Sequence, residues 1–106
     1  VQTCALPILE PNLSLNIEAT AGFRRLAKDM GAYASTLAIA WLLHQGPHIL
    51  PIPGTRSVDH LRELAKGAAL TLSPAELQAI AHTLPVGWAH GDRYSKDQWI
   101  GPEKYC

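Results

Sequence analysis

A short stretch with the chemistry to bind a phosphate lies in the middle of the chain. An apolar run ends in Pro-Gly at Gly54, Thr55, Arg56 and Ser57 follow, and an amphipathic segment begins at Val58. Hydroxyls and the free N–H groups at the start of a helix suit an anion, and a glycine lets the backbone approach a ligand closely. A guanidinium matches the geometry of a phosphate monoester. The sequence therefore predicts an anion site at this junction.

These side chains also have ordinary structural interpretations. Arg56, taken alone, is more often a solvated surface charge, but its place after Pro-Gly-Thr at a strand–helix junction favours a ligand contact. One turn further on, His60 fits an exposed helical position as well as a ligand contact. Glu63 fits an ion pair with a cation of its own helix, either Arg62 or Lys66, as well as a ligand contact. Both interpretations stay open at this point.

Two other residue patterns do not support chemistry. His44 and His48 have i, i+4 spacing, but Gly46-Pro47 between them breaks any shared helical face, so we expect no metal site. Residues 57–60 contain a serine, an aspartate and a histidine, but four consecutive positions cannot form the relay geometry of a hydrolase triad. We therefore predict neither a metal centre nor a nucleophilic site.

Composition excludes further classes of function. The chain has 106 residues, with 9 basic and 9 acidic side chains, so it has no electrostatic footprint for nucleic acid or for an anionic membrane. No apolar run approaches the roughly 20 residues that span a bilayer, and the N-terminus lacks the features of a signal peptide. Cys4 and Cys106 lie at the two ends, which favours a reduced, cytoplasmic chain.

Periodicity predicts the elements that must position the junction. Apolar residues at helical spacing predict one helix over 16–30, with Gly31 as its stop, and a second over 34–45 that is apolar on every side, with Trp41 in the core. A third is expected over 58–67, with Ser57 as N-cap and an inward face made of Val58, Leu61, Leu64 and Ala65.

The fourth helix and a strand complete the expected elements. LSPAEL carries a capping box, in which Ser73 caps and Glu76 stands three residues later, and predicts a helix over 74–83. Residues 49–52 predict a short buried strand, although Pro51 cannot donate to a sheet. One strand cannot form a sheet alone. The order of elements therefore indicates one end of a larger α/β domain.

A longer segment around the junction resembles a known family. AIAWLLHQGPHILPIPGTRSVDHLRE is similar to the C-terminal part of the aldo-keto reductases, and so are the LA-x-x-x-G ending of the first helix, the LSPAEL helix and GDRY at 91–94. The resemblance covers about residues 15 to 95. It implies the C-terminal portion of a (β/α)₈ TIM barrel, mostly helical as an isolated chain, in which residues 34–83 supply the seventh helix, the eighth strand, the eighth helix and a supplementary helix.

The resemblance also implies a ligand. In that family, Gly54, Thr55, Arg56 and Ser57 would hold the adenosine 2′-phosphate of NADPH, with two further residues, His60 and Glu63, near the ribose and adenine. Two departures weaken the match: Leu64 stands where the family has an asparagine that contacts adenine, and Tyr33-Ala34 replaces a Thr-Pro helix entry. One polar contact to adenine is therefore missing.

The resemblance implies an incomplete enzyme. The family's catalytic tyrosine, lysine, aspartate and histidine lie on earlier strands, so we expect a fragment of an NADP-dependent carbonyl reductase that has no turnover and tends to self-associate. We expect residues 1–12 to be a non-native or disordered lead, 13–86 the barrel segment and 87–106 an irregular tail. The alternatives are a short helical protein that binds an anion or a partner, and an inactive structural remnant.

Overall fold

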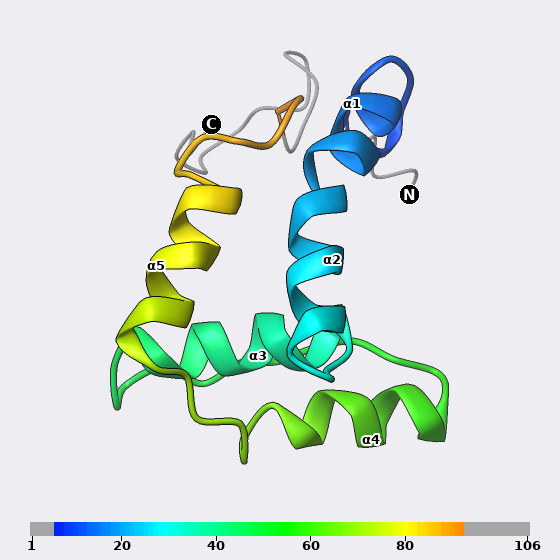
Figure 1. The fold of residues 1–106 in the computed structure, drawn as a ribbon. Helices are drawn as coiled ribbons and strands as arrows, with labels where there is room; N and C mark the ends of the chain where they lie inside the picture. The colour runs from blue at the N-terminus through cyan, green and yellow to red at the C-terminus, as the bar shows by residue number, and fades with distance from the viewer. Residues whose placement is uncertain (1–5, 93–106) are drawn as a thin grey trace.

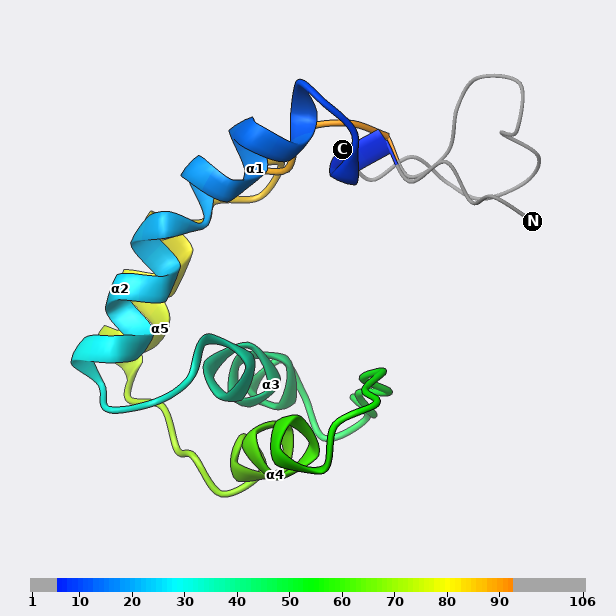
Figure 2. The same ribbon diagram turned by 90° about the vertical axis from the view of Figure 1, so that its right-hand side faces the viewer.

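A computed structural model describes residues 6–92 of the chain. Both cysteines, and Arg93 and Tyr94 of the GDRY segment, lie outside the described residues. A 3-10 turn, η1 (Leu6–Ile8), precedes five helices: α1 (Asn12–Ala19), α2 (Ala21–Asp29), α3 (Ala34–His44), α4 (Val58–Lys66) and α5 (Pro74–Thr83). Helices α2 and α5 stand side by side, and α3 and α4 run across their lower ends (Figure 1). Viewed from the side, the helices form a curved layer with a concave face (Figure 2).

The helical character predicted over 16–30 is confirmed, but two helices, α1 and α2, occupy that region and meet at Thr20. The Thr20 hydroxyl donates back to the carbonyls of Asn16 (2.8 Å) and Ile17 (3.1 Å), and Arg24 also donates to the Ile17 carbonyl (2.8 Å). Side-chain bonds of this kind compete with the helical ladder and bend helices. The periodicity of the apolar face did not reveal this break.

The end of α2 confirms the predicted stop at Gly31. Its φ is +67°, which L-residues with a side chain rarely adopt. The N–H of Ala32 donates to the Ala27 carbonyl (2.9 Å), and the N–H of Gly31 donates to the Lys28 carbonyl (2.9 Å). These two bonds form a Schellman motif, which turns the chain sharply from α2 into α3.

Helix α3 forms the centre of the packing. Leu37 and Ala40 are fully buried, and residues from α2, α5 and the loop before α5 complete the small core: Ala27, Leu72 and Ile80. Trp41, predicted as core, is only half-buried against this cluster. Leu42, one residue later, is exposed. Helix α3 is therefore apolar on all sides, as predicted, but it is covered on only part of its surface.

Helices α3 and α4 approach each other closely. The Thr36 hydroxyl donates to the Glu63 carbonyl at 2.7 Å, and a Cβ placed on Gly67 would lie 2.6 Å from Cβ of Ile39 and 2.8 Å from the Thr36 carbonyl oxygen. Only a residue without a side chain fits at that distance. The contact between the two helices therefore depends on Gly67.

The inward face predicted for α4 is wrong in most of its members. Val58 is 65% exposed and Leu61 is 54% exposed, Ala65 is also exposed, and only Leu64 is half-buried. The helix turns its Glu63–Gly67 edge toward α3, so the apolar stripe faces outward. The amphipathic pattern identified the stripe correctly, but no described element covers it.

The predicted strand over 49–52 is also wrong. Residues 49–55 are extended without strand pairing, and within residues 6–92 the structure has no strand. Leu50 is 84% exposed and Ile52 is 90% exposed, so the segment is not buried. An extended segment needs a neighbouring strand to satisfy its backbone groups, and Pro51 has no N–H to offer one. The described residues are therefore helical, as expected for the isolated chain, and contain no part of a sheet.

Helix α5, which the sequence predicted over 74–83, begins as predicted. The Ser73 hydroxyl accepts from the N–H of Glu76 (3.3 Å), and the Glu76 carboxylate accepts from the N–H of Ser73 (2.7 Å). The bonds from the Ser73 backbone and hydroxyl hold the pKa of Glu76 below its ordinary value. The cap therefore contributes stability above the ordinary pKa of a glutamate, and that contribution is lost as the pH falls through the lowered value.

The segment that follows α5 contacts the first helix of the chain. The side-chain amide of Asn16 on α1 donates to the His90 carbonyl (2.8 Å) and to the Pro7 carbonyl (3.0 Å), and its oxygen accepts from the N–H of His90 (2.7 Å). One asparagine thus joins α1, the η1 turn and the segment that follows α5.

We expect the isolated chain to self-associate. Exposed apolar side chains lie on α1, on α4 and on the extended segment, and the net charge is zero, which promotes association. Sedimentation velocity over a range of concentrations is expected to show a sedimentation coefficient that rises with concentration. A concentration-independent monomer with a sharp, cooperative thermal transition would contradict this expectation.

Candidate functional site

The N-terminus of α4 is capped by the side chains that the sequence singled out. The hydroxyl of Ser57, the predicted N-cap, accepts from the N–H of His60 at 3.3 Å, which confirms the cap. The hydroxyl of Thr55 accepts from the N–H of Ser57 and donates to the Ser57 carbonyl, both at 3.2 Å. The first two N–H groups of the helix, those of Val58 and Asp59, have no acceptor within the helix and remain suited to an anion.

A depression of about 360 Å³ lies on the concave side of the molecule, and a second one of about 310 Å³ lies at this helix terminus. Side chains of α3, the extended segment and α4 line the second depression: Ser35, Gly54, Thr55, His60, Glu63 and Leu64. Four of the six residues predicted to bind the cofactor thus share one surface hollow.

Arg56 and Ser57 are not among the residues that line this hollow. Arg56 is exposed, and it directly follows Thr55, which does line the hollow. A Cβ placed on Gly54 would meet nothing within 4 Å, and its φ is not in the left-handed region, so the described fold does not by itself require glycine there. The predicted role of Gly54 is to let the backbone approach a bound ligand closely.

The ion pair considered for Glu63, with Arg62 or Lys66, does not form. Arg62 pairs instead with Asp59 (3.0 Å). The Lys66 ammonium lies over the Tyr33 ring, 5.8 Å from its centre. Neither cation of α4 holds Glu63. Its half-buried carboxylate lies near the Ser35 hydroxyl at 3.5 Å and lines the hollow.

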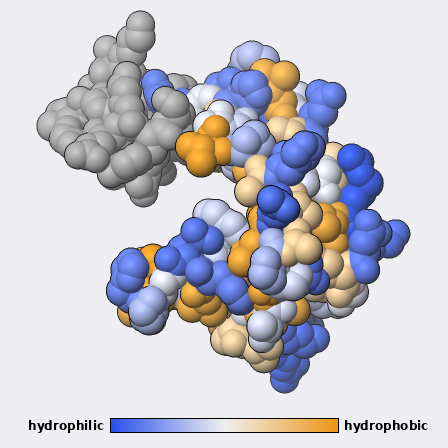
Figure 3. Space-filling view, turned by 60° about the vertical axis from the view of Figure 1, so that its left-hand side comes forward, coloured by the Kyte–Doolittle hydropathy of each residue, from blue (hydrophilic) through white to orange (hydrophobic). Residues whose placement is uncertain are grey.

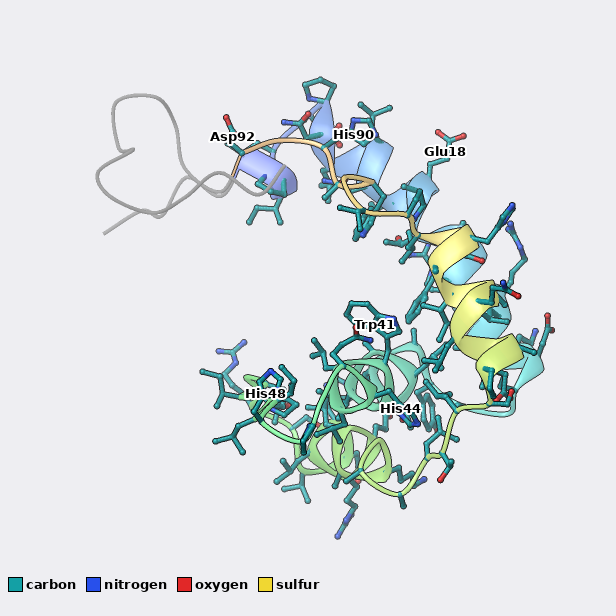
Figure 4. The ribbon with its side chains drawn as sticks, turned by 90° about the vertical axis from the view of Figure 1, so that its left-hand side faces the viewer. Glu18, Trp41, His44, His48, His90 and Asp92 are labelled. Atoms are coloured by element: carbon teal, nitrogen blue, oxygen red, sulfur yellow. The ribbon has the colours of Figure 1, made fainter. Side chains whose placement is uncertain are left out.

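His44 is the last residue of α3, and His48 lies in the loop that follows. His44 makes a contact from Nδ1 to the Ala40 carbonyl (2.8 Å), and its Nε2 accepts from the N–H of Leu72 (3.2 Å), which joins α3 to the loop before α5. His48 lies apart from it in the loop after α3 (Figure 4). Within the described residues, no group of three His, Cys, Asp or Glu side chains could hold a metal ion.

The hollow on the concave side has a different character. Aromatic and aliphatic side chains of α2, α3, α5 and the following segment line it, with one hydroxyl: Thr20, Phe23, Ala38, Trp41, Leu42, Ile80, Leu84 and Trp88. Trp41 points into this concave side (Figure 4), and hydrophobic patches border the hollowed face in the space-filling view (Figure 3). The polar hollow at α4 is the candidate phosphate site, because it lies at a helix N-terminus, is lined by hydroxyls and adjoins the exposed Arg56.

Sequence reasoning missed one lining residue of the candidate site. Ser35 lies 28 positions before Glu63, on a different helix, and only the crossing of α3 over α4 brings the two together. No local pattern marks it. Leu64 also lines the hollow, at the position where the sequence suggested that a polar contact to adenine is missing.

None of the helices within residues 6–92 is long and apolar enough to cross a membrane.

Comparisons with known proteins show the family of the chain. The model of the aldo/keto reductase family matches residues 4–84. The chain is 36% identical to probable aldo-keto reductase 1 of Glycine max over 83 residues, which are 78% of this chain and 24% of that protein. It is 46% identical to the uncharacterized oxidoreductase C215.11c of Schizosaccharomyces pombe over 48 residues, which are 45% of this chain and 16% of that protein. No solved structure matches.

The chain thus spans about a quarter of the first relative and about a sixth of the second. The family match includes α1 to α5 up to Thr83 and the whole of the candidate ligand site. The chain belongs to the aldo/keto reductase family.

Proposed function

We propose that this chain is the C-terminal segment of an NADP-dependent aldo-keto reductase and that it carries the part of the cofactor site that binds the adenosine 2′-phosphate. The observation that carries the proposal is the arrangement at the start of α4. Thr55 and Ser57 order the helix terminus, Arg56 stands exposed beside it, and His60 and Glu63 follow one turn further on. A 2′-phosphate would meet N–H groups, a hydroxyl and a guanidinium in one place.

The two departures from ordinary globular packing support the same proposal. The extended segment 49–55 has no partner strand, and the apolar stripe of α4 has no cover. In a (β/α)₈ barrel a strand at this position pairs with its neighbours, and the helices around it pack on the sheet. A complete barrel of about 250 residues would therefore satisfy both features.

The chemistry of such a reductase is the transfer of a hydride from NADPH to a carbonyl carbon while an acid protonates the carbonyl oxygen. The residues of this chain bind and orient the adenosine end of the cofactor. The acid and its partners would come from earlier strands, so the 106-residue chain alone is expected to have no turnover. The carbonyl substrate would be chosen by loops outside this segment.

The test is to read the coding frame upstream of residue 1 and to compare two proteins. We expect the continuous frame to encode barrel strands, and its product to oxidise NADPH in the presence of aldehydes or ketones, followed at 340 nm. We expect the 106-residue chain to oxidise none. Turnover by the short chain would contradict the proposal, and so would a start codon directly before it, which would favour a short helical protein that binds an anion or a partner.

A further inference from the structure

Part of the contact between α3 and α4 is made at Glu63, a residue that lines the polar hollow. Thr36 donates to the carbonyl of Glu63 at 2.7 Å, and Ser35 lies 3.5 Å from the carboxylate Oε2 of the same residue. Thr36 is buried, whereas Ser35 and Glu63 are half-buried and both line the polar hollow. Two adjacent hydroxyls of α3 thus contact Glu63 at its backbone and at its side chain.

From this geometry we propose that Ser35 is a positioning residue of the cofactor site: it orients the Glu63 carboxylate to accept a hydrogen bond from the 6-amino group of adenine. The inference rests on the proposed function. The 3.5 Å separation is long for a bond between oxygens, so its effect is to select one orientation of the carboxylate and not to add much binding energy. The short Thr36 bond fixes the backbone from which that orientation starts.

The surroundings leave the carboxylate available for the ligand. The cations that would otherwise draw it away are engaged elsewhere, Arg62 with Asp59 and Lys66 with the ring of Tyr33. A carboxylate has about four acceptor positions, and Ser35 uses one on Oε2. The remaining positions can accept from an amino group. The family resemblance leads one to expect an amide side chain at position 64, but this chain has Leu64 there. Among the residues that line the hollow, Glu63 has the carboxylate that can accept a hydrogen bond from adenine.

The experiment compares two cofactors that differ in one donor. NADPH carries the 6-amino group, and its purine analogue has a hydrogen atom at C6 and keeps N1 as an acceptor, so it has no donor there for a carboxylate. Binding of each to the 106-residue chain is measured by saturation-transfer NMR, which reports weak ligands and tolerates an associated protein. Four proteins are compared: wild type, Ser35→Ala, Ser35→Thr and Arg56→Ala.

We expect wild type to prefer NADPH over the analogue. Ser35→Ala is expected to weaken NADPH about threefold, the low end of the net contribution of one hydrogen bond, because Glu63 loses its preferred orientation, and to leave the analogue unchanged. Ser35→Thr keeps the hydroxyl and is expected to restore the preference. Equal losses for both ligands in Ser35→Ala, or no loss for either, would overturn the inference, since a merely structural role cannot distinguish the two bases.

Arg56→Ala separates this inference from the proposed function. If Arg56→Ala weakens NADPH and the analogue alike while Ser35→Ala does not affect base preference, the phosphate site stands and the role of Ser35 is wrong. If neither NADPH nor its analogue binds the wild-type chain, or if Arg56→Ala changes neither, the proposed function fails, and the role of Ser35 fails with it.

Discussion

Arg56→Ala is expected to weaken the binding of NADPH by roughly 1–3 kcal/mol, the range for hydrogen bonds to charged groups, and to leave NADH nearly unchanged. Only NADPH carries the 2′-phosphate, and a guanidinium grips such a group through charge-assisted hydrogen bonds. Because Arg56 is exposed, salt screens its interaction, so the loss for NADPH is expected to shrink as the ionic strength rises. Dissociation constants for both cofactors, measured at low and high salt in the longer reductase, test this.

Arg25→Ala is the matched control. Arg25 is also an exposed arginine, but it lies on α2, away from the polar hollow, so its loss changes the net charge equally without touching the site. It is expected to leave the ratio of NADPH to NADH affinity at the wild-type value. Equal losses for both cofactors in Arg56→Ala would mean that the arginine supports the loop and does not read the phosphate.

Gly67→Ala is expected to destabilise the fold by about 1–3 kcal/mol, the usual cost of overpacking. The added Cβ would lie 2.6 Å from Cβ of Ile39 and 2.8 Å from the Thr36 carbonyl oxygen, and neither atom can move by a change of rotamer. Helices α3 and α4 would have to separate. Because that contact also holds Glu63, the substitution is expected to lower NADPH affinity as well.

The direction of the stability change in Gly67→Ala distinguishes close packing of the two helices from helix propensity alone. Gly67 has an ordinary helical φ of −61°, so helix propensity alone predicts that alanine stabilises the protein by up to about 1 kcal/mol. Gly54→Ala provides the comparison for stability, since its Cβ would meet nothing within 4 Å. The urea midpoint of the helical circular dichroism signal, measured in the longer reductase, reports both. A midpoint for Gly67→Ala at or above wild type would show that the helices do not pack as described.

Local signals in the sequence predicted the helices that have caps. The Ser73 and Glu76 capping box and the cap at Ser57 fixed the starts of α5 and α4, because such caps depend on residues three positions apart. The break at Thr20 was missed because side-chain bonds to the carbonyl of Ile17, and not the apolar periodicity, end α1 there.

Features that depend on distant partners could not be predicted in the same way. The apolar run at 49–52 has the composition of a buried strand, but a strand exists only through its neighbours, and Leu50 and Ile52 are exposed here. Conversely, the contact of Ser35 with Glu63 needs the crossing of two helices, which no spacing in the sequence encodes. The candidate site residues after Pro53 could be proposed from the sequence because they lie within two turns of a single helix start, which has a local cap at Ser57.

Recognition of a 2′-phosphate by the start of α4 can be measured as the retention of the 106-residue chain on two immobilised nucleotides. Adenosine 2′,5′-bisphosphate and adenosine 5′-monophosphate differ in the 2′-phosphate alone, and self-association affects both columns equally. We expect the chain to be retained on the bisphosphate, to elute from it with salt, and to pass through the monophosphate. In Arg56→Ala the difference between the two columns is expected to disappear. Equal retention on both columns, or a difference that persists without Arg56, would contradict it.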